Sequence, residues 1–131
     1  MTLTDLEQTS FPVTEDVFLG GKLTVRQPRH GYRAGIDAVL LAACVRAPPG
    51  GPRSLLDIGA GAGTVGLCAA ARLAQLEVVL LEREPALAQL AAKNASANGL
   101  DHRVRSVAAS VTAPAALLDG LGLAAESFDQ C

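Results

Sequence analysis

Beyond residue 52, short apolar runs alternate with segments whose apolar residues recur at helical spacing. The runs at 54–58, 77–81 and 103–108 predict three strands, and the segments 64–74 and 85–98 predict two helices between them. Strands that alternate with helices are typical of a parallel sheet with crossover helices. The sequence therefore predicts an α/β fold with a Rossmann-like, doubly wound parallel sheet, of which this chain carries an incomplete part.

The last part of the chain has a weaker pattern. Residues 112–125 are rich in Ala and Leu and predict a further helix, although Pro114 and two glycines interrupt it. Residues 127–129 lead toward a fourth strand, and the sequence ends there.

The residues before the sheet predict a small extension. Residues 17–27 read as two short strands around Gly20 and Gly21, which is a hairpin signal. A loop follows, and then a helix at 37–46 for which Asp37 is the expected N-cap. The Pro- and Gly-rich residues 47–52 form a connector. We therefore expect an N-terminal extension over residues 1–52 and a main domain over residues 53–131.

Composition narrows the class of protein. Half of the residues are apolar and the net charge is −2, so the chain can build a core and shows no overall basic character. Cys44 and Cys68 lie in apolar stretches and are expected to be small buried hydrophobes, which suits a reducing cytoplasm. The first 20 residues are too polar for a signal peptide, and no apolar run is long enough to cross a membrane. No His, Cys and carboxylate cluster suggests a metal.

A glycine-rich loop is the main candidate for chemistry. Residues 57–63, DIGAGAG, join the first strand of the sheet to its helix, and Glu82 ends the second strand. In doubly wound folds both positions face one crevice, where a carboxylate can accept hydrogen bonds from ribose hydroxyls. Residues 61–66 also fit G-x-G-x-x-G, the dinucleotide fingerprint. Asp57 favours S-adenosylmethionine instead, because that ligand has no phosphate and carries an ammonium and a sulfonium.

The chain resembles the class I methyltransferases. The resemblance lies in DIGAGAG at 57–63, LLE at 80–82, KNA at 93–95 and NGL at 98–100. Upstream, FLGG at 18–21, QP at 27–28, GYR at 31–33, Gly35 and DAVLLA at 37–42 are similar to the bacterial tRNA adenine N6-methyltransferase-like family. The similarity covers roughly residues 14–130.

The resemblance implies a cofactor site. It implies that Glu82 holds the ribose, that Gly59, Gly61 and Gly63 pack against the methionine part, and that Ser110 stands where the family has an acidic adenine contact. Ala60 and Arg83 complete the expected site beside these residues. The family carries Asn-Pro-Pro-Tyr after its fourth strand, and this sequence stops before that motif. We therefore expect no catalytic residue within the chain and no activity from it alone.

Two residues of the upstream loop extend the candidate site. If this loop folds over the cofactor, Arg33 can bind the methionine carboxylate and Asp37 the amine. Alternatively, Asp37 caps its helix and Arg33 is solvated. The loop is also the most basic part of the chain, so it is where tRNA phosphates would bind.

The favoured function is methyl transfer from S-adenosylmethionine to an adenine amino group of tRNA. Three alternatives remain open on the sequence. The chain can be part of a protein glutamine methyltransferase or of a nicotinamide-dependent oxidoreductase. It can also be a fragment that binds cofactor and has no activity.

Overall fold

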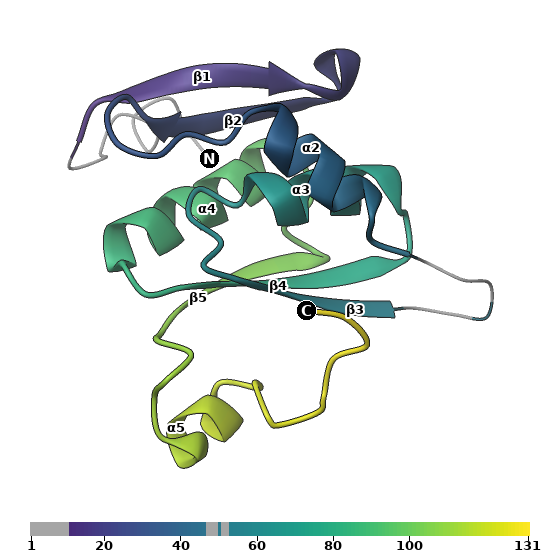
Figure 1. The fold of residues 1–131 in the computed structure, drawn as a ribbon, viewed down its shortest axis with the longest axis vertical. Coiled ribbons are helices and arrows are strands. Elements are labelled where there is room, and N and C mark those ends of the chain that lie inside the picture. Colours follow the sequence, from purple (N-terminus) through teal and green to yellow (C-terminus); the bar gives the residue numbers. More distant parts are fainter. Residues whose placement is uncertain (1–10, 47–49, 51–52) are drawn as a thin grey trace.

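A three-stranded parallel sheet forms the centre of the molecule (Figure 1). The computed structural model describes residues 11–46, 50 and 53–131. The sheet has the order β3 (Arg53–Ile58), β4 (Leu76–Glu82), β5 (Val104–Ala108). Helices α3 (Thr64–Arg72) and α4 (Pro85–Ala97) connect successive strands and lie together on one face of the sheet (Figure 1). The predicted α/β class and the parallel sheet are confirmed.

Alternation along β4 builds a core on each face of the sheet. Val78 and Leu80 pack in the larger cluster, under α3 and α4, while Val79 and Leu81 pack in a smaller cluster with Leu123 on the opposite face. Successive side chains of a strand point to opposite faces, so a run of apolar residues is what a strand covered on both faces requires.

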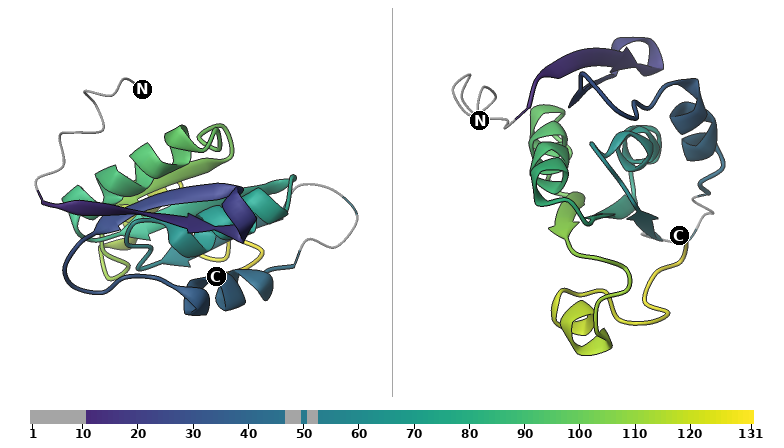
Figure 2. Two further views of the ribbon diagram at one scale, coloured as in Figure 1. Left: turned by 90° about the horizontal axis from the view of Figure 1, so that it is seen from above. Right: turned by 60° about the vertical axis from the view of Figure 1, so that its left-hand side comes forward.

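The N-terminal extension packs on the helices and not on the sheet (Figure 2). Strands β1 (Val13–Phe18) and β2 (Leu23–Pro28) pair antiparallel on either side of a short 3-10 turn, η1 (Leu19–Gly21). Leu23 and Val25 are fully buried and belong to the same core cluster as the sheet. The predicted hairpin is confirmed, but β1 begins at Val13 and not at residue 17, because a polar run conceals its first half.

Helix α2 (Ile36–Ala43) packs beside α3. The prediction that Asp37 is its N-cap was wrong, because Gly35 holds that position and Asp37 lies in the first turn. The Asp37 carboxylate instead accepts hydrogen bonds from the Gly35 amide, at 2.9 Å, and from the Tyr32 hydroxyl. The predicted connector at 47–52 lies mostly outside the described residues.

The chain crosses to the other face of the sheet after β5. The helix there is α5 (Ala115–Gly120), shorter than the predicted 112–125, and Pro114 is its N-cap residue. The chain then returns along the free edge of β3, where the Leu56 amide donates to the Gln130 carbonyl at 2.9 Å in a parallel bridge. This bridge is a single residue, so the sheet of the described residues keeps three strands, but it lies on the side of β3 opposite β4, where the order of neighbouring segments reverses. In doubly wound folds the ligand crevice lies at such a reversal.

Candidate functional site

A cavity of about 530 Å³ lies at the carboxyl ends of β3 and β4. This volume is within the range of small-molecule sites, roughly 300–1,000 Å³. Its floor is the glycine loop after β3, and its roof is the loop that follows β2. It is lined by Gln27, Pro28, His30, Gly31, Tyr32, Ala34, Leu41, Asp57, Ile58, Gly59, Ala60, Gly61, Ala62, Thr64, Val65, Glu82 and Leu87. Five predicted site residues, at positions 57, 59, 60, 61 and 82, therefore meet in one cavity.

A glycine of the loop and a glycine at the start of α3 serve different purposes. Gly61 has a φ of +57°, and a Cβ built on it would meet nothing within 4 Å, so the backbone there is open to a ligand. A Cβ on Gly66 would lie 2.4 Å from Leu80 and 2.9 Å from Val78. The absence of a side chain at Gly66 therefore allows α3 to pack closely on β4.

Glu82 is held in place by backbone amides. One carboxylate oxygen accepts from the Gly61 amide at 2.8 Å and the other from the Glu84 amide at 3.0 Å. The residue is only 9% exposed. Each oxygen keeps a further lone pair, so the carboxylate can still accept hydrogen bonds from a ligand.

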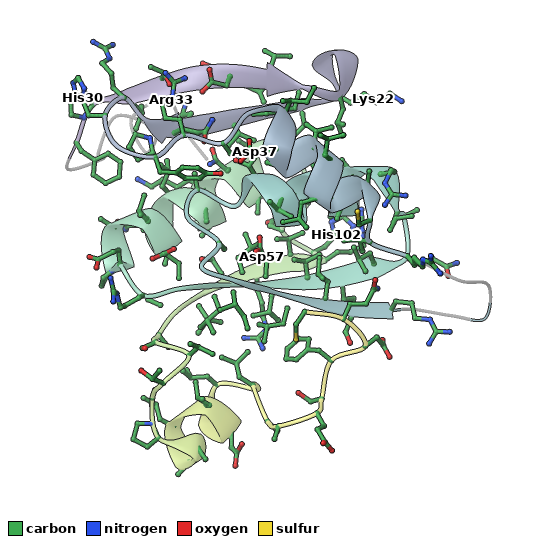
Figure 3. All side chains as sticks on the ribbon, viewed as in Figure 1. Lys22, His30, Arg33, Asp37, Asp57 and His102 are labelled. Carbon is green, nitrogen blue, oxygen red and sulfur yellow. The ribbon has the colours of Figure 1, made fainter. Side chains whose placement is uncertain are left out.

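Asp57 lies between the sheet and the helices that cover it (Figure 3). Its carboxylate accepts from the Gly66 amide, in the first turn of α3, at 3.2 Å. Burial, aided by the nearby charge of Glu82 and opposed by the Gly66 hydrogen bond, raises the Asp57 pKa to about 6. A half-buried carboxylate that is costly to ionise is suited to a cationic ligand, which would offset that cost.

A buried glutamine holds the roof of the cavity. The Gln27 side chain is 3% exposed and joins the two ends of the roof loop, accepting from the Ala34 amide at 2.8 Å and donating to the Ala34 carbonyl at 3.1 Å. Sequence reasoning missed Gln27 as a site residue. Its partner Ala34 is only seven positions away in the sequence. However, no repeat or residue spacing indicates that an isolated glutamine is buried.

The two upstream residues of the predicted site are engaged elsewhere. The Arg33 guanidinium contacts both oxygens of Asp16, at 2.7 and 2.8 Å, and this pairing helps lower the Asp16 pKa against the effect of burial. Asp37 lies beside the roof, and its carboxylate accepts a hydrogen bond from the Tyr32 hydroxyl. Tyr32 itself lines the cavity. Figure 3 shows Lys22 and His30 at opposite ends of the hairpin.

The remaining predicted residues lie around the cavity and not in its lining. Gly63 is the N-cap of α3, and a Cβ there would lie 2.8 Å from Leu80. Arg83 is exposed, and its Nε lies 3.6 Å from a carboxylate oxygen of Glu84. The Ser110 hydroxyl lies just beyond β5 and bonds to that of Thr112 at 2.8 Å.

The described residues were also compared with the requirements of a metal site and of a membrane-spanning helix, and they meet neither. Among the described residues, no three His, Cys, Asp or Glu side chains gather in a way that could hold a metal ion. Within the same residues, no helix combines the length and apolar character that a membrane span requires.

Cys68 is buried as expected, but Cys44 is exposed, because it follows the last turn of α2 on the outer surface.

Comparison with known proteins decides the family. The profile of the methyltransferase small domain matches residues 34–119, which include the glycine loop and Glu82. The chain belongs to this family. The membership argues against the nicotinamide-dependent oxidoreductase that the glycine pattern left open.

One curated relative is the tRNA1(Val) (adenine(37)-N6)-methyltransferase of a Flavobacteriaceae bacterium (strain 3519-10). It is 35% identical over 86 residues, which are 66% of this chain and 36% of the relative. The chain thus spans about a third of the length of the curated relatives that it matches.

Solved structures share the fold. A predicted O-methyltransferase from Agrobacterium tumefaciens, Atu636, matches with a TM-score of 0.56 and 33% identity over 65% of this chain and 41% of its own. TYW2 of Pyrococcus horikoshii, solved in complex with MeSAdo, matches with a TM-score of 0.62 and 20% identity over 77% of this chain and 37% of its own. The fold is that of Rossmann-like methyltransferases.

Proposed function

We propose that this chain provides the S-adenosylmethionine-binding part of a methyltransferase that modifies an adenine amino group of tRNA. The observation that carries the proposal is the cavity where the strand order reverses, with Asp57 and Glu82 in its lining. The curated relatives, named as tRNA adenine N6-methyltransferases, support the choice of acceptor. Action on tRNA would place the protein in the cytoplasm.

The residues of the cavity fit the proposed cofactor. Glu82 is oriented by two amides and has lone pairs left for the two ribose hydroxyls. Asp57 can face the ammonium of the methionine part, and the open backbone at Gly59 and Gly61, with Ala60 between them in the lining, allows close approach. When bound, the cofactor supplies an electrophilic methyl group on a sulfonium. The chain's own contribution is to bind and orient that group, and positioning can supply a large part of the catalysis of such a transfer.

The other predicted contacts remain part of the proposal. Arg33 would meet the methionine carboxylate, Asp37 the amine and Ser110 the adenine, while Arg83 and Gly63 support the loop and strand end beside them. Arg33 must exchange its Asp16 partner to do so. In this arrangement the domain at residues 53–131 provides the floor of the site, and residues 27–34 of the N-terminal extension provide its roof.

Calorimetric titration with S-adenosylhomocysteine tests the cofactor. The wild-type chain and Glu77→Ala should bind, since Glu77 is an exposed glutamate of β4 that does not line the cavity, whereas Glu82→Ala should bind much more weakly. Binding that is equal in all three proteins would contradict the proposed ribose contact.

The acceptor needs a separate experiment. A methyltransferase that contains this chain, incubated with labelled S-adenosylmethionine and unmodified tRNA, should give label in N6-methyladenosine after nuclease digestion, whereas residues 1–131 alone should give none. Label that enters a glutamine of an added protein substrate, and not the tRNA, would favour the protein glutamine methyltransferase instead.

A further inference from the structure

Two asparagines on α4 bind the free edge of the hairpin. Asn98 accepts from the Thr24 amide at 3.0 Å and donates to the Thr24 carbonyl at 2.8 Å. Asn94, one turn earlier, does the same with Arg26, at 3.0 and 2.9 Å. The two side-chain amides thus act as a neighbouring strand would for β2.

Only Asn94 also reaches the floor of the cavity. Its amide nitrogen donates a second hydrogen bond, to the Ala62 carbonyl in the glycine loop, at 2.9 Å. Asn94 is 2% exposed, so these bonds are made away from water, where an unpaired polar group is costly. The side chain therefore ties the floor of the cavity to β2.

The connection continues into the roof. Arg26 is followed directly by Gln27, which holds both backbone groups of Ala34 and donates to Asp16 at 3.1 Å. Asp16 in turn holds Arg33. Hydrogen bonds, together with the backbone between Arg26 and Gln27, therefore connect the glycine loop through Asn94 and β2 to the loop that covers the cavity.

We propose that Asn94 is a positioning residue that fixes the distance between the glycine loop and the roof of the cofactor cavity. This inference rests on the proposed function, because it names the residue that sets the shape of the proposed cofactor site. Asn94 does not line the cavity, so it acts through Ala62 and Arg26 and not by contact with ligand.

The sequence offers a matched control. Asn94→Ala and Asn98→Ala each remove the paired hydrogen bonds to one residue of β2, but only Asn94→Ala removes the bond to Ala62. Affinity for S-adenosylhomocysteine should fall about tenfold in Asn94→Ala, the equivalent of one lost hydrogen bond in the positioning of the site, and stay within about twofold of wild type in Asn98→Ala. Thermal unfolding of both variants shows how far a general loss of stability contributes.

Amide hydrogen exchange provides a second readout that needs no ligand. In Asn94→Ala, exchange should become faster at Gly63 in the floor and at Ala34 in the roof, while Asn98→Ala should leave both near their wild-type rates. Wild-type chain that fails to bind S-adenosylhomocysteine would contradict the proposed function, and the exchange rates would then decide the role of Asn94 alone. Equal losses of affinity in the two variants, or unchanged exchange at Gly63 and Ala34 in Asn94→Ala, would overturn the proposal.

Discussion

Replacing Asp57 by Asn should make the protein more stable and its cofactor binding weaker. The substitution keeps the shape of the side chain and an oxygen for the Gly66 amide, but removes the charge. In the folded protein the Asp57 pKa is about 6, raised from 3.8 mainly by burial. A carboxyl that holds its proton more tightly in the folded state loses stability as the pH rises from the unfolded pKa to the folded one.

The size of the effect follows from these two pKa values. Their difference corresponds to roughly 3 kcal/mol of unfolding free energy, which the ionised Asp57 costs in full above about pH 7. By pH 5 about half of that cost is already present, because the cost builds up between the two pKa values. Asp57→Asn should therefore be more stable than wild type by up to roughly 3 kcal/mol at pH 8, and by about 1.4 kcal/mol less at pH 5.

Urea denaturation at several pH values between 5 and 8 measures this difference. The control is Asp101→Asn, because Asp101 is an exposed carboxylate in the loop between α4 and β5. The stability of the control relative to wild type should change little over the same range. An advantage of Asp57→Asn that is absent at pH 8, or equal at pH 5 and pH 8, would refute the reasoning. Cofactor affinity should move in the opposite direction, since the ammonium loses its counter-charge.

Three further outcomes are expected. Glu82→Ala should weaken S-adenosylhomocysteine binding by roughly 10- to 100-fold, measured by calorimetry with Glu77→Ala as control, because a charge-assisted hydrogen-bond pair is lost. Gly66→Ala should lower the unfolding free energy by about 1–3 kcal/mol in urea denaturation, because its Cβ would overlap Leu80; an unchanged midpoint would mean that α3 can shift freely. Burial raises the Cys68 pKa to about 11, so iodoacetamide at pH 8 should modify the exposed Cys44 and Cys131, and Cys68 only after unfolding; rapid alkylation of Cys68 would contradict its burial.

The sheet and the floor of the site could be predicted from the sequence, because the patterns that indicate them are local. Runs such as the one ending in Glu82 are continuous and apolar, since the strand is covered on both faces. The glycine loop stands out because close backbone approach and positive φ need glycine at fixed positions. The floor residues could therefore be named before the structure was known.

The roof of the cavity was harder to predict from the sequence, because it depends on contacts between distant parts of the chain. Asn94 lies 68 positions from Arg26, and nothing in the helical pattern distinguishes it from a solvated asparagine. Asp37 follows the rule for a helix N-cap, yet the N-cap of its helix is Gly35, two residues earlier, and the Asp37 carboxylate accepts a hydrogen bond from Tyr32. Local preference is overridden there by the fold of the loop over the cavity.

Resonance shifts of backbone amides during titration with S-adenosylhomocysteine test the central claim most directly. Saturable shifts should concentrate in the floor at Gly59, Ala60 and Gly61, at Glu82, and in the roof at Tyr32. Titration without saturable shifts, or with shifts confined to the opposite face around α5, would contradict a cofactor site where the strand order reverses.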